Sequence, residues 1–302
     1  MDVAQAGECS MAFSESSQER GHKSHNYPVI IYKYFCPDRR TILQNRLIRF
    51  TPPGQFNDPF DCLPYVEGYN AEFLENSVNK AVDTNRANLK ALGRDFPDEF
   101  WLYCKQELLR KYIADPSSLS SRHLKLSLRP RMNSEVGVLC VCAANKSILM
   151  WSHYSASHTG FALGFDSEND FFKPRPHEPR EIGELRPVTY TNERVRITFP
   201  PSDADPSPDI FFTKNQEWAY EKEWRILRFL KDADQKPSDT VHLFAVPPSA
   251  IREVLFGTFA PADLIADLLP SKQKDSDLGH LQFYQAKLSP NCFQMDIIPY
   301  AP

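Results

Sequence analysis

Glycine is scarce in this chain, with 11 among 302 residues, whereas proline is abundant, with 25. The sequence contains neither GxGxxG nor GxxxxGKS, the patterns whose backbone cradles phosphates in common nucleotide-binding folds. Long apolar runs are lacking too. None approaches the roughly twenty residues of a membrane span, and no secretory signal is apparent. These absences argue against a glycine-loop nucleotide fold and predict a chain without membrane contact.

The cysteines lack a metal-binding spacing. There are seven, an odd number, and they are scattered along the sequence. No two of them have the spacing CxxC. Cys140 and Cys142 lie only two positions apart. We therefore expect no zinc cluster and predict no metal site. Since unpaired cysteines are typical of reducing compartments, we expect a cytoplasmic protein. The alternative is delivery into a target cell by a route that needs no signal.

The remaining composition is that of an ordinary globular protein. Apolar residues make up 41% and charged residues 25%, with a net charge of -4. The whole surface is therefore not suited to attract nucleic acid. Residues 1–26 are polar and aperiodic, which predicts a disordered or loosely held tail. Residues 27–302 show no convincing internal boundary, so we expect a single domain there.

Hydrophobic periodicity predicts an α+β fold, with a mixed, mainly antiparallel sheet core and helices inserted at 70–113. Helices are expected at 41–45, 71–92, 97–113 and 261–269. Strands are expected at 29–34, 47–50, 136–141, 161–165, 188–190, 222–227, 241–246, 250–257, 281–286 and 292–299. The two long helices each carry an apolar stripe that we expect to face a core: Phe73, Leu74, Val78 and Ala81, and then Phe100, Tyr103, Cys104, Leu108 and Tyr112.

Three segments concentrate polar chemistry beside aromatic residues. In the loop QFNDPFD (55–61), Phe56 and Phe60 either pin Asn57, Asp58 and Asp61 toward a ligand or anchor a turn that the acids cap. In SILMWSHYSASHTGFALGFD (147–166), hydroxyl, imidazole and indole groups crowd where a turn is expected to meet a strand. The alternative for that segment is a core whose polar groups bind backbone.

The third segment is DIFFTKNQEWAYEKEWRILR (209–228). If 222–227 form a strand, Glu223 and Arg225 share one face, while Trp224 and Ile226 point toward the core. A carboxylate on a strand beside aromatic rings can have a shifted pKa and perform chemistry. The alternative is a surface ion pair between Glu223 and Arg225 or Lys222.

Together, these segments resemble the bacterial family labelled domain of unknown function 2971. The resemblance spans roughly residues 30–260, and it brings no settled activity. It rests on the order and spacing of Ile31-Tyr32-Lys33-Tyr34, Ile48–Pro52, Phe56–Asp61, Met150–Tyr154 with His158, Gly160 and Phe161, and Lys214 with Trp218–Arg225.

A second resemblance, in the order of strands and polar residues, is to the ADP-ribosyltransferase fold. In that fold an Arg or His on the first strand holds NAD, a Ser or Tyr on a middle strand supports the nicotinamide side, and a late Glu contacts the ribose. By order, Lys33 or Tyr34 stands where that fold has Arg or His. The middle group is Ser152, His153 or Tyr154, and the acid is Glu223, with Glu221 as the nearby alternative.

The resemblance implies an NAD-dependent ADP-ribosyltransferase or NAD-cleaving enzyme, acting as a bacterial toxin, effector or defence protein. NAD is then the substrate, the acceptor is a protein or nucleic acid, and a cognate antitoxin or immunity protein is the expected partner. The catalytic residues implied are Glu223, Tyr154 and His153, and those binding NAD are Lys33, Tyr34, Asn57, Ser152, Trp151 and Arg225.

Two other functions fit the same residues. The first is a metal-dependent nuclease, in which clustered acids bind Mg²⁺. Its candidate ligands are Asp58, Asp61, Glu221 and Glu223. The second is a non-catalytic binding module, in which the aromatic motifs form core and the polar residues are buried and satisfied.

Overall fold

The computed structural model describes residues 27–116, 128–200, 207–269 and 276–300. The predicted tail at 1–26 lies outside the described residues. Contacts divide the described chain into two compact units, one made of residues 63–130 and 194–210, the other of residues 27–62, 131–193 and 211–300. Because these units are defined by contacts and not by independent folding, the single domain expected over 27–302 stays a prediction.

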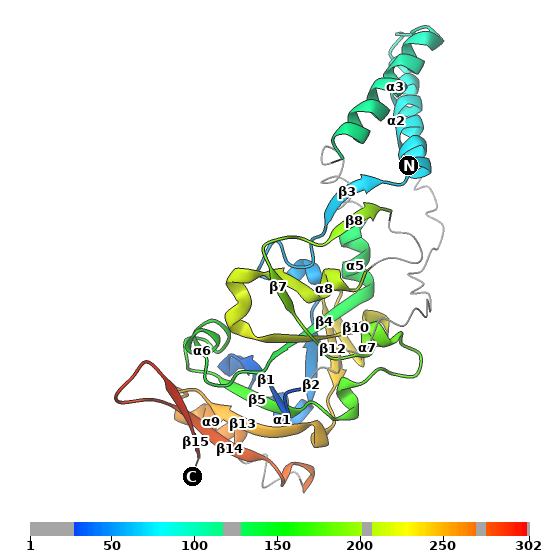
Figure 1. Cartoon of the computed structure of the whole chain (residues 1–302). Coiled ribbons are helices and arrows are strands. Elements are labelled where there is room, and N and C mark those ends of the chain that lie inside the picture. The colour runs from blue at the N-terminus through cyan, green and yellow to red at the C-terminus, as the bar shows by residue number, and fades with distance from the viewer. Residues whose placement is uncertain (1–26, 117–127, 201–206, 270–275, 301–302) are drawn as a thin grey trace. The chain divides into compact units, whose positions relative to one another are not determined.

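The first unit contains a helical hairpin (Figure 1). The helices α2 (Ala71–Ala91) and α3 (Asp98–Ala114) confirm the two predicted long helices. Asn70 caps α2, since its side chain accepts a hydrogen bond from the Phe73 backbone N–H at 3.2 Å. Two short strands, β3 (Tyr65–Tyr69) and β8 (Arg196–Phe199), pair in parallel in the same unit.

The core of this hairpin differs in part from the predicted stripes. Leu74 and Val78 of α2 are buried as expected, together with Val82. In α3, however, the buried residue is Trp101, whereas Tyr103 is 62% exposed. A two-helix hairpin buries only a narrow strip of each helix, so one large indole fills the contact and neighbouring apolar residues face solvent.

The second unit is built on an eight-stranded sheet with the order β15-β14-β13-β5-β1-β4-β10-β6 (Figure 1). Every neighbouring pair is antiparallel except β13 and β14, which run parallel. The α+β class with a mixed, mainly antiparallel sheet is thereby confirmed. The strands are β1 (Ile30–Phe35), β4 (Val136–Cys142), β5 (Phe161–Asp166), β6 (Arg186–Pro187), β10 (Glu223–Phe229), β13 (Ile251–Phe256), β14 (Gln282–Leu288) and β15 (Met295–Pro299).

The described residues also form smaller sheets and short helices. Three strands, β11 (Gln235–Ser238), β12 (Val241–Ala245) and β2 (Leu47–Phe50), form an antiparallel sheet, and β7 (Thr189–Thr191) pairs in parallel with β9 (Thr213–Asn215). The short helices are α1 (Ile42–Asn45), α5 (Arg129–Glu135), α6 (Ile148–Tyr154), α7 (Arg180–Gly183), α8 (Asp209–Phe212) and α9 (Ala262–Leu268). Every predicted strand is present, with ends shifted by at most a few residues.

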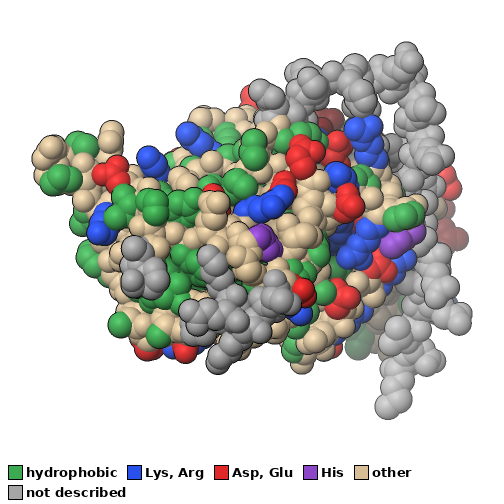
Figure 2. All heavy atoms as spheres, turned by 90° about the horizontal axis from the view of Figure 1, so that it is seen from below, with side chains coloured by type: hydrophobic (Ala, Val, Ile, Leu, Met, Phe, Trp, Pro, Cys, Tyr) green, Lys and Arg blue, Asp and Glu red, His purple; other side chains and the backbone are tan. Residues whose placement is uncertain are grey.

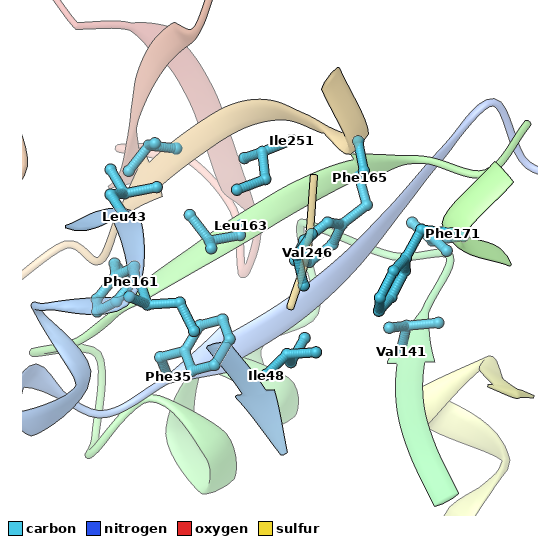
Figure 3. Packing of buried hydrophobic residues seen from close by; sticks show 14 of the residues in the cluster. Phe35, Leu43, Ile48, Val141, Phe161, Leu163, Phe165, Phe171, Val246 and Ile251 are labelled. Atoms are coloured by element: carbon cyan, nitrogen blue, oxygen red, sulfur yellow. The ribbon is translucent and has the colours of Figure 1, made fainter. Parts of the chain in front are cut away.

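The main core lies in this second unit (Figure 3). It joins apolar side chains of β1, β4, β5 and β13 with those of α1 and β2, among them Phe35, Leu43, Ile48, Val141, Phe161, Leu163, Phe165 and Ile251. The strand β4 is a nearly continuous apolar run because it is central and covered on both faces. Gly137 in β4 permits β2 to come close, since an added Cβ would lie 2.8 Å from the Cβ of Phe50.

The described helices are all too short or too polar to cross a bilayer. On the face drawn in Figure 2, acidic and basic side chains are interspersed with hydrophobic ones. That face therefore offers no broad field of one charge sign, in agreement with the small net charge of -4.

Candidate functional site

The three polar segments come together within the second unit. The loop that holds Asp61, the helix α6 and the region from β9 to β10 all contribute side chains to one hydrogen-bonded group. Lys33 of β1 lies beside this group, because β4 separates β1 from β10 by a single strand. The convergence expected from the sequence is therefore present for these segments.

The second segment folds differently from the prediction. Ser152, His153 and Tyr154 lie on the helix α6, not at a turn or on a strand. Ser147 caps this helix by accepting a hydrogen bond from the Met150 backbone N–H at 3.3 Å. The predicted strand at 161–165 follows as β5. The expectation of a hydroxyl-bearing middle strand, taken from the ADP-ribosyltransferase order, is thus wrong, because the capping serine starts a helical turn.

A left-handed turn joins α6 to β5. Ala156, Ser157 and His158 have φ values of 49°, 54° and 68°, which residues with a Cβ seldom adopt. Gly160 closes the turn, its N–H donating to the Ser155 carbonyl at 2.8 Å. A Cβ at Gly160 would collide with the carbonyl oxygen of Phe35. The HTG sequence therefore positions α6 against β1, which places Tyr154 at the polar group.

The third segment forms β10, with Glu223 and Arg225 on one face as predicted. The Arg225 Nε–H donates to Glu223 Oε1 at 2.8 Å, and its two terminal nitrogens donate to the two carboxylate oxygens of Asp61 at 2.8 and 2.7 Å. The Arg225 side chain is completely buried. The alternative of a surface ion pair is therefore wrong: the pair is buried and doubly anchored.

Lys214 extends the ion pair into a cluster. Its ammonium lies 2.5 Å from Glu221 Oε2, 3.0 Å from Glu223 Oε2 and 3.9 Å from Asp61 Oδ2. The five side chains are each at most 5% exposed, so their charges are screened little by water. We call this group the ion cluster: Asp61, Lys214, Glu221, Glu223 and Arg225.

The two glutamates of the ion cluster differ in their protonation. Burial raises the pKa of Glu223, but the positive charges of Arg225 and Lys214 outweigh it and hold that pKa well below its usual range. Burial also raises the pKa of Glu221. The positive charge of Lys214 lowers this pKa by less than burial raises it, so it stays above the ordinary value. Glu223 is thus a fixed charge, whereas Glu221 can accept a proton.

Glu221 connects the ion cluster to more accessible residues. Tyr154 donates its phenol proton to Glu221 Oε1 at 2.5 Å, and Asn57 hydrogen-bonds to the Tyr154 side chain. His153, which is exposed, has its Nδ1 3.0 Å from the hydroxyl of Tyr220. We call these four residues the rim: Asn57, His153, Tyr154 and Tyr220.

The other predicted NAD-binding residues are less accessible. Trp151 has no exposed surface, and its Nε1–H donates to the Asn145 carbonyl at 2.8 Å. The Tyr34 ring packs edge-on against Trp151, with centroids 4.9 Å apart, and its hydroxyl donates to the Ala144 carbonyl. Ser152 is half-buried on α6. Binding roles for Trp151, Tyr34 and Ser152 stay predictions, and the first two could touch a ligand only after becoming exposed.

Lys33 is a poor phosphate anchor in this structure. Its ammonium donates to the Cys140 carbonyl at 3.1 Å. Burial lowers the pKa of Lys33, so the charged form that a phosphate would need is disfavoured. Asp58 has a different place again: its Oδ1 accepts from the Phe60 backbone N–H at 2.8 Å and closes the turn of the first loop. Asp58 therefore follows the capping interpretation, whereas Asp61 enters the ion cluster.

Sequence reasoning missed two members of this site. Lys214 was only part of a motif, with no assigned role, and Tyr220 was only an aromatic neighbour. Asn215 caps the 3-10 helix η5 (Gln216–Glu221) by accepting from the Glu217 N–H at 2.9 Å. That turn brings residue 214 back beside residues 221 and 223. A buried lysine needs a carboxylate partner, so the acidic run after Lys214 was a usable signal.

Comparison with known proteins identifies a matching family. The family described as "Protein of unknown function (DUF2971)" matches residues 150–226, which cover most of α6, Lys214 and Glu221 through Arg225. No curated protein and no solved structure matches the chain significantly. The matched stretch holds most of the ion cluster and the rim. Residues 150–226 therefore match the DUF2971 family, the family that the motifs of the sequence resemble.

Proposed function

We propose that this chain cleaves the bond between nicotinamide and ribose in NAD and transfers the ADP-ribose to water or to a macromolecule. The observation that supports this most is the position of Glu221. Its carboxylate lies between the phenol of Tyr154 and the ammonium of Lys214, next to the half-exposed ring of Tyr220. The reaction needs a carboxylate beside the sugar and an aromatic surface for nicotinamide.

The chemistry assigns a role to that carboxylate. When the bond between C1′ and the nicotinamide nitrogen breaks, its electron pair neutralises the pyridinium and leaves a positive ribosyl group. A negative charge near C1′ stabilises this oxocarbenium ion. The nucleophile, water or an acceptor hydroxyl, then bonds to C1′ and loses its proton. The ionised carboxylate of Glu221 could stabilise this cation, and its raised pKa makes it a suitable acceptor for the proton.

We assign the working role to Glu221, whose 3% exposed side chain would have to become exposed for a sugar to reach it, and a supporting role to Glu223. Both carboxylate oxygens of Glu223 already accept hydrogen bonds from Arg225, and one also accepts from Lys214. With Cys140 as a further donor, Glu223 has little capacity left for a substrate, whereas Glu221 accepts one hydrogen bond on each oxygen, from Tyr154 and from Lys214. Glu223 instead holds Lys214 in place. Among the residues implied for NAD, Asn57 and His153 are exposed, Lys33, Ser152 and Tyr154 are partly buried, and Tyr34, Trp151 and Arg225 are buried.

The nuclease alternative loses support from the same geometry. Asp61, Glu221 and Glu223 would be its metal ligands, but the ammonium of Lys214 already lies among their oxygens. A divalent cation there would meet the charges of both Lys214 and Arg225 at short range. Asp58, the fourth acid of that hypothesis, is engaged in its own turn.

The binding-module alternative is favoured by one observation, the complete burial and pairing of Arg225. Under that alternative the ion cluster only fixes the loop to β10, and NAD is not consumed. The setting of a toxin, effector or defence protein comes from the resemblance and not from this geometry. It would make a protein or nucleic acid the acceptor.

Incubation with NAD labelled in the nicotinamide and in the adenylate decides between these functions. We expect nicotinamide release by the wild-type chain and a loss of about 10²- to 10³-fold in Glu221→Gln, the range typical for removal of one electrostatic stabiliser. Glu217→Gln is the matched control, because Glu217 is an exposed acid of the same 3-10 helix. Circular dichroism establishes that each variant is folded.

Two results would overturn the proposal. One is the absence of both nicotinamide release and label transfer when the wild-type chain is mixed with protein and nucleic-acid acceptors. The other is equal release by the wild type, Glu221→Gln and Glu223→Gln. Nucleic-acid cleavage that EDTA abolishes would instead favour the nuclease.

A further inference from the structure

A second group of polar residues lies in the same unit, away from the residues that the NAD proposal uses. His177 and Glu178 lie in the segment between the 3-10 helix η4 (Asp170–Phe172) and α7, and Asp232 ends the 3-10 helix η6 (Leu230–Asp232) after β10. One ligand atom from each of the three side chains lies within 4.8 Å of the others. From this group and the contacts below, we propose that His177, Glu178 and Asp232 bind a Zn²⁺ ion.

The first argument is an unsatisfied oxygen. The Glu178 side chain has no exposed surface. Its Oε2 accepts from Arg228 Nη1 at 2.8 Å and from the Arg175 backbone N–H at 3.1 Å. Its Oε1 is buried and has no hydrogen-bond partner among the described residues. Leaving a buried carboxylate oxygen without a partner is costly, and a bound cation would supply that partner.

The second argument is the separation of the other two donors. His177 Nε2 lies 3.1 Å from Asp232 Oδ2. Two ligands bound tetrahedrally to zinc at about 2.1 Å are about 3.4 Å apart, so these atoms already have nearly the required spacing. The His177 side chain is 57% exposed, and it can turn by the small amount needed to bring its nitrogen closer to Glu178.

The donor set indicates which metal is bound. One imidazole nitrogen with two carboxylate oxygens suits zinc, whereas magnesium and calcium take oxygen ligands almost exclusively. Three protein ligands leave the fourth position to water, which matches the exposure of His177 and the 23% exposure of Asp232. The cysteine spacing that the sequence lacks is not required for such a site.

The charges of the surroundings are consistent with a divalent ion. Arg228 is a neighbouring cation, and its Nη2 donates to the carbonyls of Phe171 and Lys173 at 2.9 and 3.0 Å. Its charge is therefore balanced by Glu178 Oε2 and backbone dipoles. Asp232 faces His177, and its carboxylate is also attracted by Arg228. A bound Zn²⁺ would pin the 173–179 segment to the end of β10.

Zinc titration of the full chain tests the proposal, with its accessible thiols first blocked by iodoacetamide so that exposed cysteines cannot bind the metal. We expect one Zn²⁺ per chain, competition against a chromophoric chelator in the micromolar range, and a rise in the melting temperature. His177→Ala and Asp232→Asn should each weaken binding at least tenfold. Asp170→Asn, a highly exposed acid near the same segment, is the control and should bind like the wild type.

The proposal is overturned if no saturable binding is found below millimolar Zn²⁺. It is also overturned if His177→Ala and Asp232→Asn bind zinc as tightly as the wild type. Because neither residue belongs to the ion cluster or the rim, this result is independent of whether the chain consumes NAD.

Discussion

At the scale of single residues, Glu223 shows how a carboxylate can be held ionised inside a protein. Burial alone would raise its pKa. However, Arg225 and Lys214 lie within 3.0 Å of its oxygens, and their positive charges lower the pKa by more than burial raises it. A group whose pKa is depressed on folding adds stability above its unfolded pKa, near 4.3, and loses that contribution as the pH falls toward the folded value. The affected window is therefore acidic.

Because folding lowers the pKa of Glu223, we predict how the free energy of unfolding depends on pH. From about pH 4 downward, the free energy of the wild type should fall more steeply than that of Glu223→Gln, by up to about 1.4 kcal/mol per pH unit. Urea unfolding between pH 3 and 7 measures both slopes, with the exposed Glu217→Gln as control. Parallel curves for wild type and Glu223→Gln would show that Glu223 is not held below its ordinary pKa.

The sequence predicted the members of the site better than their surroundings. The shared face of Glu223 and Arg225 follows from the period of two along a strand, and it is correct. The burial of that face could not be inferred, because it depends on Asp61, which lies 164 positions before Arg225. A pairing at such a separation has no local signal, so a surface ion pair was an equally good interpretation of the same residues.

At the scale of elements, the hairpin of α2 and α3 depends on one large side chain. Trp101 is 7% exposed and packs with Leu74, Val78 and Val82. The helical spacing of apolar residues predicted both helices. The predicted apolar stripe of α3 was wrong in Phe100 and Tyr103, which are 41% and 62% exposed. A periodic pattern fixes the helix and not the width of the surface that its neighbour covers.

We therefore predict unequal effects for two neighbouring aromatic residues. Trp101→Ala should destabilise the hairpin by about 3–5 kcal/mol, because it leaves a cavity in a small core. Tyr103→Ala should change stability by no more than about 0.5 kcal/mol. Hydrogen exchange of the α2 and α3 amides reports the local free energy of opening. Comparable loss of protection in both variants would contradict the burial described for α3.

At the scale of the whole molecule, the reactivity of the cysteines reports how accessible the interior of the second unit is to solvent. The described cysteines are free thiols, of which Cys62 and Cys142 are buried and Cys292 is exposed. Burial raises the pKa of Cys142 to about 12, and the pKa of Cys62 is raised by burial as well. Since the thiolate is the reactive form, both are protected by burial and by protonation.

Alkylation of the native chain should therefore be selective. We expect iodoacetamide near pH 7.5 to label Cys292 within minutes, and to label Cys62 and Cys142 only after denaturation. Peptide mapping by mass spectrometry locates each label, and Cys292→Ser provides the control for the fast site. Rapid labelling of Cys142 in the folded chain would mean that β4 is more open than its position in the sheet implies.

The fold class was predictable, whereas the order of strands was not. Alternating and apolar runs identify strands, and the mainly antiparallel sheet follows from the many short strands and turns. The neighbours β1 and β5 are separated by more than a hundred residues, and β13 pairs in parallel with β14 through a crossover. Side-chain periodicity contains no information about such partners, because every strand of this sheet presents similar apolar residues.

The lysine of the ion cluster has a wider consequence for where such a protein can work. Many enzymes neutralise clustered acids with a metal that must be acquired from the surroundings, and a chelator or a metal-poor compartment inactivates them. Here the counter-charge of Glu221 and Glu223 is encoded in the chain as Lys214 and is held by covalent connection. The positive charge that neutralises these acids is thus part of the polypeptide itself.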